Sequence, residues 1–139
     1  MRVFLLCLLT MVLSKTLVVA LDFNSTKSRR VMVVAGAGGD EEYTSIFSEW
    51  ADVLAKAFQD NSAELVNITN KPENTDARKI IEDKLKKWAL AKEDEIWILL
   101  VGHGTFDGKQ AKFNLVGDDI SDLDFQRWLK PHQGPLVFI

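Results

Sequence analysis

Apolar residues in this sequence gather in short runs from residue 31 onward. The runs 31–35 (VMVVA) and 95–101 (EIWILLV) are almost continuously apolar and rich in β-branched residues, a pattern typical of strands buried on both faces of a sheet. A third such run covers 135–139 (PLVFI), and a weaker one covers 63–69 (AELVNIT). The hydrophobic pattern therefore predicts four core strands.

Two segments that separate these runs repeat their apolar residues at helical spacing. The first is predicted to run from Thr44, its expected N-cap, to about Gln59, and the second to begin at the capping residue Thr75. The residues expected to face the core are Phe47, Trp50, Leu54 and Ala57/Phe58 in the first helix, and Ala77, Ile81, Leu85 and Trp88 in the second. The lysines expected to form a solvated face that needs no partner are Lys79, Lys84, Lys86 and Lys87.

Shorter elements are expected in the last third of the sequence. Residues 105–108 (TFDG) have the composition of a turn, and 109–115 (KQAKFNL) alternates loosely, as in a small edge strand or hairpin. Residues 121–124 (SDLD) resemble a capping box that opens a helix through Leu129.

Strands and helices thus alternate along the chain, and connections of helical length imply parallel strands. We expect an α/β fold, a three-layer sandwich with a mostly parallel sheet. The run 135–139 ends the sequence with no later element to cover it. We therefore expect that the sequence is the front part of a longer protein and that the sheet is incomplete after its fourth core strand.

The N-terminal residues are organised like a secretory signal peptide, with Arg2 before an apolar stretch and a cleavage site after Ala20. The apolar stretch is too short for a comfortable membrane span, so we expect a secreted or periplasmic protein. An uncleaved signal that anchors the chain is the alternative. The expected domains are a signal peptide at 1–20, a linker at 21–30 and an α/β domain at 31–139.

Composition excludes several classes of function. The formal net charge is −3, so there is no basic excess that would attract nucleic acid. The only cysteine is Cys7, within the expected signal, which rules out an internal disulfide and a cysteine-based zinc site. Two histidines, His103 and His132, argue against a histidine-only metal site, and His132 is expected in a solvated loop. We predict no cofactor, no metal and no stable membrane insertion.

A glycine cluster at 36–39 (GAGG) follows the first strand and raises the alternative of a flavodoxin-like or Rossmann-like nucleotide binder. However, Glu41 stands where a dinucleotide fingerprint needs glycine, and the Lys-Ser/Thr pair of a P-loop is absent. The acidic residues that follow would repel a phosphate. We interpret the glycines as permitting a tight turn into the helix and a close approach of substrate.

His103 is the leading candidate for chemistry, because it lies between Gly102 and Gly104 directly after the run 95–101. Functional groups in open α/β sheets lie beyond the carboxyl ends of the strands. A histidine that only caps the strand end is the alternative. Asp107 is interpreted as a turn residue, although orienting His103 or binding calcium stay open for it. The acidic group explained mainly by helix capping, with calcium as the alternative, is Asp118, Asp119, Asp122 and Asp124.

The segments LLVGHGTFDG and FNLVGDDIS together resemble the caspase-like superfamily of cysteine peptidases, which includes caspases, legumain-type peptidases and gingipains. The front segment, VVAGAGGDEEYTSIFSEWADVLAKAF, is similar to the first strand and helix of the legumain type. The resemblance covers residues 31–139 and is nearest to secreted bacterial caspase-like and legumain-type proteins.

This resemblance implies that His103 is the general base or acid of a peptidase and that the N–H of Gly104 contributes to an oxyanion hole. The partner would be a cysteine just after the fourth strand, beyond Ile139, and the substrate a polypeptide. The position of the arginine that recognises substrate in the legumain type holds Ser48. A non-catalytic caspase-like binding module is the main alternative, and the nucleotide binder is the second.

Overall fold

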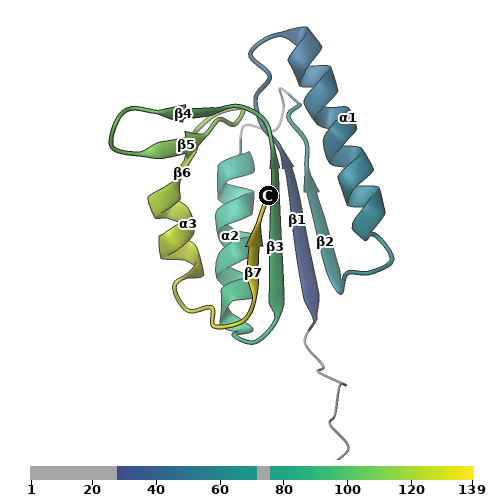
Figure 1. Ribbon diagram of the computed structural model, residues 1–139, viewed down its shortest axis with the longest axis vertical. Coiled ribbons are helices and arrows are strands. Elements are labelled where there is room, and N and C mark those ends of the chain that lie inside the picture. The colour runs from purple at the N-terminus through teal and green to yellow at the C-terminus, as the bar shows by residue number, and fades with distance from the viewer. Residues whose placement is uncertain (1–27, 72–75) are drawn as a thin grey trace, which may run out of the picture.

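The computed structural model describes residues 28–71 and 76–139 (Figure 1). Its strands and helices alternate through the first half of the chain, as the hydrophobic pattern predicts. In chain order the elements are β1 (Arg29–Ala35), α1 (Glu41–Phe58), β2 (Glu64–Ile68), α2 (Ala77–Leu90), β3 (Glu95–Val101), β4 (Gly104–Phe106), β5 (Ala111–Phe113), β6 (Ile120–Ser121), α3 (Asp122–Leu129) and β7 (Leu136–Phe138).

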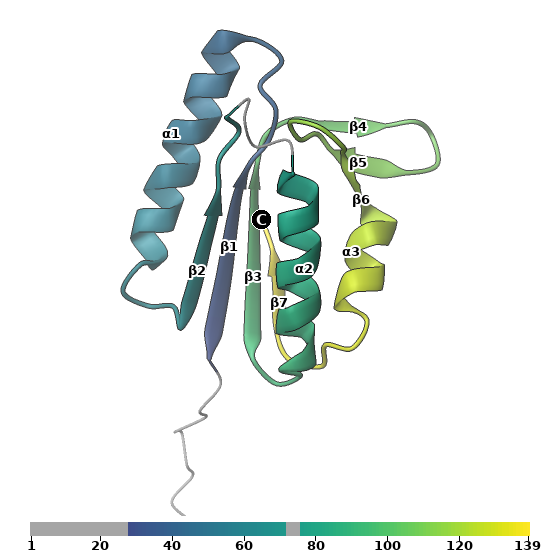
Figure 2. The ribbon, with the colours of Figure 1, turned by 180° about the vertical axis from the view of Figure 1, so that it is seen from behind.

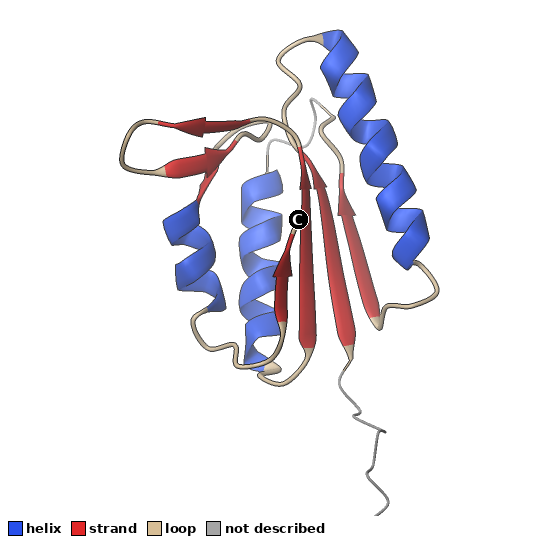
Figure 3. Cartoon of the chain, viewed as in Figure 1, coloured by secondary structure: helices blue, strands red, loops and turns tan. Residues whose placement is uncertain are grey.

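The main sheet has the strand order β2-β1-β3-β7, and all its neighbouring strands are parallel. Helix α1 covers one face of this sheet, while α2 and α3 cover the other (Figures 1 and 2). The protein is therefore a three-layer α/β sandwich, which confirms the expected fold class. Strands β4, β5 and β6 form a small antiparallel sheet beside the carboxyl ends of the main strands (Figure 3).

Alternation along the strands divides the apolar side chains into two cores. Met32, Val34, Ile96 and Ile98 face α2 and α3, whose Trp88 and Trp128 are the largest fully buried side chains of the described residues. Val31, Val33, Ala35 and Leu99 face α1, where Ala51 and Ala55 let the helix approach the strands closely. Because helices cover both faces of the sheet, β3 contributes side chains to both cores, as its continuous apolar run predicts.

A network of ion pairs lies at the amino-terminal ends of the strands of the main sheet. Arg30 bonds to Glu64 of β2 (Nη1 to Oε2, 3.0 Å) and to Asp94 before β3 (Nε to Oδ2, 2.7 Å). The Glu64 carboxylate also accepts bonds from Lys84 Nζ at 3.0 Å and from the indole Nε1 of fully buried Trp88 at 2.7 Å. Burial raises the pKa of Glu64, but the bonds from Lys84 and Trp88 outweigh it and leave this pKa below its ordinary value.

The first helix begins earlier than predicted. Its N-cap is Asp40 and not Thr44, because Asp40 has an extended backbone and its Oδ1 accepts a bond from the N–H of Tyr43 at 2.9 Å. Thr44 lies inside the helix and donates its hydroxyl to the carbonyl of Asp40. Trp50 is 65% exposed, so its predicted core position is wrong. The inward face of the helix is centred on Ala51 and Ala55, which leaves Trp50 on the flank.

Three further predictions need correction. The final strand is an edge strand rather than a buried one, with Leu136 43%, Phe138 45% and Ile139 66% exposed. Strand β1 includes Arg29 and Arg30, which were expected in the linker. The lysines of α2 form the expected solvated face except for Lys84, which is half-buried and bonds to Glu64, while Lys79 and Lys86 pair within the exposed face with Asp83 and Glu82.

The capping box at α3 is confirmed, with both of its reciprocal bonds between Ser121 and Asp124. The expected hairpin is present, but its strands are β4 and β5, so Thr105 and Phe106 of the expected turn lie in a strand, and β5 is the middle strand of the small sheet rather than an edge strand. Helix α2 begins after Asp76, whose side chain makes no capping bond. The predictions for Thr75, the signal peptide at 1–20 and most of the linker fall outside the described residues.

Candidate functional site

His103 lies at the carboxyl end of β3, in the middle of the main sheet, where the sequence predicts it. The side chain is exposed, and two rings from the first turns of α1 pack edge-on against its imidazole. The ring centroids lie 5.2 Å from Tyr43 and 4.9 Å from Phe47. Among the described residues the imidazole has no hydrogen bond or ion pair, so both ring nitrogens are available to another group.

Backbone hydrogen bonds hold the turns on either side of His103. The carbonyl of His103 accepts a bond from the N–H of Asn114 at 3.0 Å, and the carbonyl of Asn114 accepts one from Ala37 at 2.9 Å. Gly36 donates its N–H to the carbonyl of Val101 at 2.8 Å. Backbone hydrogen bonds thus link the turn after β1, the end of β3 and the segment after β5 to one another.

Gly104 begins β4, opposite Phe113 of β5. The preceding pair of this ladder, His103 and Asn114, is a hydrogen-bonded pair, because Asn114 donates its N–H to the carbonyl of His103. Pairs in an antiparallel ladder alternate between bonded and non-bonded, so the next pair, Gly104 and Phe113, is non-bonded. The N–H of Gly104 therefore points away from β5, on the exposed side of the hairpin, where it can serve as a donor.

The glycine cluster at 36–39 is explained by the protein's own packing. A Cβ at Gly36 would lie 2.6 Å from the carbonyl oxygen of Asn114, and one at Gly38 would lie 2.2 Å from the N–H nitrogen of Thr44. Gly39 has a φ of +80°, which turns the chain into α1. The tight turn into the helix is confirmed. The N-terminus of α1, where a bound phosphate would lie, is capped by the carboxylate of Asp40.

Asp107 is a turn residue, as interpreted from the sequence. Its Oδ1 accepts bonds from the N–H groups of Lys109 and Gln110, both at 2.9 Å, and these bonds, that from Gln110 first, lower the pKa of Asp107. The carboxylate is used within its own turn and has no bond to His103. His132 is half-buried rather than solvated, with Nε2 3.3 Å from the carbonyl of Pro135.

The acidic group near α3 is also occupied by local contacts. Asp119 accepts a bond from the N–H of Leu115. Asp124 completes the capping box of Ser121 in α3 and bonds to Arg78 Nη1 at 2.9 Å. The bond from Arg78 and those from Ser121 hold the pKa of Asp124 far below its ordinary value. Within residues 28–71 and 76–139, no group of histidine, cysteine and carboxylate side chains is arranged to hold a metal ion.

The end of β7 lies beside the end of β3. Ile139 donates its N–H to the carbonyl of Ile98, and its carbonyl accepts a bond from Leu100. Because β7 and β3 are parallel, a chain continuing beyond Ile139 in the same direction would reach the level of Val101 and then His103.

Two serine hydroxyls that could in principle act as nucleophiles are used in structural contacts. Ser48 bonds to Asn70, and Ser121 caps α3.

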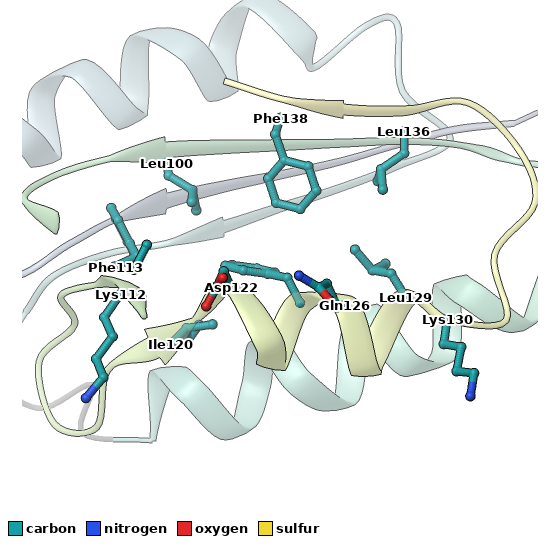
Figure 4. A pocket seen from close by; sticks show the side chains of 12 residues that line it. Leu100, Lys112, Phe113, Ile120, Asp122, Gln126, Leu129, Lys130, Leu136 and Phe138 are labelled. Carbon is teal, nitrogen blue, oxygen red and sulfur yellow. The ribbon is translucent and has the colours of Figure 1, made fainter. Parts of the chain in front are cut away.

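An apolar groove of about 590 Å³ lies between β7 and α3. Leu100, Leu136 and Phe138 point into it from the main sheet, opposite Ile120 and Leu129 (Figure 4). Neither His103 nor Gly104 lines the groove, so it is separate from the candidate site.

Sequence reasoning did not identify the residues that surround His103. Tyr43 and Phe47 carry a usable signal, since residues four apart lie on the same face of a helix. Asn114 and Asn70 carry none, because their roles depend on contacts between segments far apart in the sequence.

Comparison with known proteins finds no family model, no curated protein and no solved structure that matches this chain. Among the described residues no helix is long and apolar enough to cross a membrane.

Proposed function

We propose that the domain carries the histidine half of a cysteine peptidase site of the caspase-like type, acting on polypeptides. The observation that supports this most is the position of His103. It follows the central parallel strand, it is exposed, and its ring nitrogens are free of other described residues. An imidazole of this kind can take up and return a proton during acyl transfer.

In the proposed reaction His103 takes the proton of a cysteine thiol. The thiolate attacks the carbonyl carbon of a peptide bond, and the oxygen gains negative charge. The N–H of Gly104 donates to that oxygen, the role that its direction away from β5 allows. His103 then gives the proton to the amine as the C–N bond breaks, which leaves a thioester. Water attacks the thioester carbonyl, the C–S bond breaks, and the products are a carboxylic acid and the regenerated thiol.

The thiol must come from outside the described residues. The only cysteine in the sequence, Cys7, lies in the expected signal. A cysteine a few residues after Ile139, which the resemblance implies, would continue β7 toward the level of His103. We therefore predict that this chain alone cleaves no peptide. We further propose that residues 1–20 direct the protein to a secreted or periplasmic location.

The coding sequence beyond codon 139 tests this proposal first. If it encodes a cysteine within a few residues, the longer chain should cleave some member of a panel of basic, acidic and asparagine-containing peptides. His103→Ala should abolish that cleavage, while His132→Ala, a change of the other histidine, should preserve it. If serine, alanine or glycine occupies every such position, or if His103→Ala stays active, the peptidase proposal fails. The first of these results leaves a non-catalytic binding module.

A further inference from the structure

Asn70 is a buried polar side chain beside the candidate site and is only 3% exposed. It follows β2, and with other described residues its amide makes three hydrogen bonds. Nδ2 donates to the carbonyls of Gly36 and Thr44, both at 3.0 Å, and Oδ1 accepts the hydroxyl of Ser48 at 2.5 Å. An amide fits here because two acceptors and one donor must be satisfied at a single point.

These bonds join the two sides of the space around His103. Gly36 belongs to the turn after β1, and a Cβ on Gly102 would lie 3.0 Å from the Cα of Gly36. Thr44 and Ser48 belong to the same part of α1 that carries Tyr43 and Phe47, whose rings contact the imidazole. Asn70 thus fixes the backbone next to His103 and the helix that holds its ring.

We infer that Asn70, with Ser48, is a positioning residue that sets where the His103 imidazole lies relative to the turn at 36–38. The inference rests on the proposed function for its significance, because a proton-transferring ring must be held in a productive geometry. Asn70 itself has no contact with His103 in the structure and acts through Gly36 and α1.

The test is nuclear magnetic resonance of the full chain carrying Asn70→Ala, Ser48→Ala or the matched control Asn67→Ala. Asn67 bonds to Asp52 of α1 from an exposed position on β2, so its loss also removes a contact between strand and helix. The readouts are the ring-proton resonances of His103, which the rings of Tyr43 and Phe47 displace, and hydrogen exchange of the Gly36 and Ala37 amides.

Asn70→Ala is expected to move the His103 ring resonances and to speed exchange at Gly36 and Ala37 about tenfold, while the Ile98 amide in mid-strand is unchanged. Ser48→Ala should move the same resonances less, and it decides the question if Asn70→Ala does not fold. Asn67→Ala should leave them in place. Unmoved His103 resonances in a folded Asn70→Ala or in Ser48→Ala overturn the inference. Neither readout requires catalysis, so this result is independent of whether the peptidase proposal holds.

Discussion

The two ends of the parallel sheet are held by different kinds of interaction. At the amino-terminal end, Arg30 and Lys84 are bonded to carboxylates that lie between strands and helices. Around His103, at the other end, the contacts are neutral: aromatic rings, peptide hydrogen bonds and the amide of Asn70. Charges therefore stabilise the end where no chemistry is expected.

This difference bears on how an imidazole can be kept available. His103 is exposed and has no carboxylate bonded to it among the described residues. Aromatic rings and peptide groups restrict its position and leave both ring nitrogens open to a group that binds beside it. Four substitutions would break or sharpen the comparison between the two ends.

The largest effect is expected from Gly38→Ala at the neutral end. The new methyl would overlap the first turn of α1, 2.2 Å from the nitrogen of Thr44, so the helix must move. We expect a loss of about 3 kcal/mol in the free energy of unfolding, measured by urea denaturation. Gly104→Ala is the control, since its nearest contact, the carbonyl of Lys112, is at 3.1 Å. An equal loss of stability in both variants would contradict the explanation that the Gly38 substitution acts by steric overlap with α1.

A somewhat smaller effect is expected at the charged end. Glu64→Ala removes the acceptor of Arg30, Lys84 and the buried Trp88 indole, and should lower the free energy of unfolding by about 2 kcal/mol. The His103 resonances should not change. Glu49→Ala, at an exposed position of α1, is the matched control and should change the free energy of unfolding little. A shift at His103 in Glu64→Ala would show that the two ends are coupled.

Asp124→Asn tests an ion pair in the layer behind the sheet and depends on pH. Arg78 lowers the pKa of folded Asp124, so the ionised form stabilises the protein above the ordinary aspartate pKa of about 4. That contribution is lost as pH falls below about 4 toward the folded value. The variant should therefore lose roughly 1.5 kcal/mol at about pH 7, and the difference from the native chain should narrow at about pH 3. A difference that is constant with pH would contradict the ion-pair explanation.

The smallest effect is expected from His103→Ala. The ring is exposed and bonds to no described residue, so its loss should change the free energy of unfolding by about 0.5 kcal/mol or less. Thermal unfolding of His103→Ala beside Trp50→Ala, another exposed aromatic position, checks this. A loss well above that of Trp50→Ala would indicate that His103 mainly stabilises the packing of Tyr43 and Phe47.

Local sequence patterns predicted the elements that have a regular signature, such as a continuous apolar run or a capping box. The apolar runs identified β1 and β3, and the Ser121 capping box identified the start of α3. The position of His103 also followed from the order of strands. Trp50 was misplaced because its spacing fits the helical stripe, whereas the inward face is set by the small residues Ala51 and Ala55.

Other features could not be predicted, because they depend on contacts across long stretches of sequence. The bonds of Asn70 to Gly36 and of Asn114 to Ala37 join segments that no local pattern relates. The exposure of β7 could not be read from its composition either. An apolar run is the same whether its outer edge is covered or open.

The alternation of β3 has a consequence for how this protein tolerates change. Odd-numbered residues of the strand, such as Leu99, face α1, and even-numbered ones, such as Ile98, face α2 and α3. Exchanging one aliphatic side chain for another keeps this assignment, whereas inserting or deleting a single codon would turn every later side chain to the opposite layer. It would also rotate the imidazole away from the rings of Tyr43 and Phe47. Length, more than composition, is the property of this strand that descendants of the sequence must preserve.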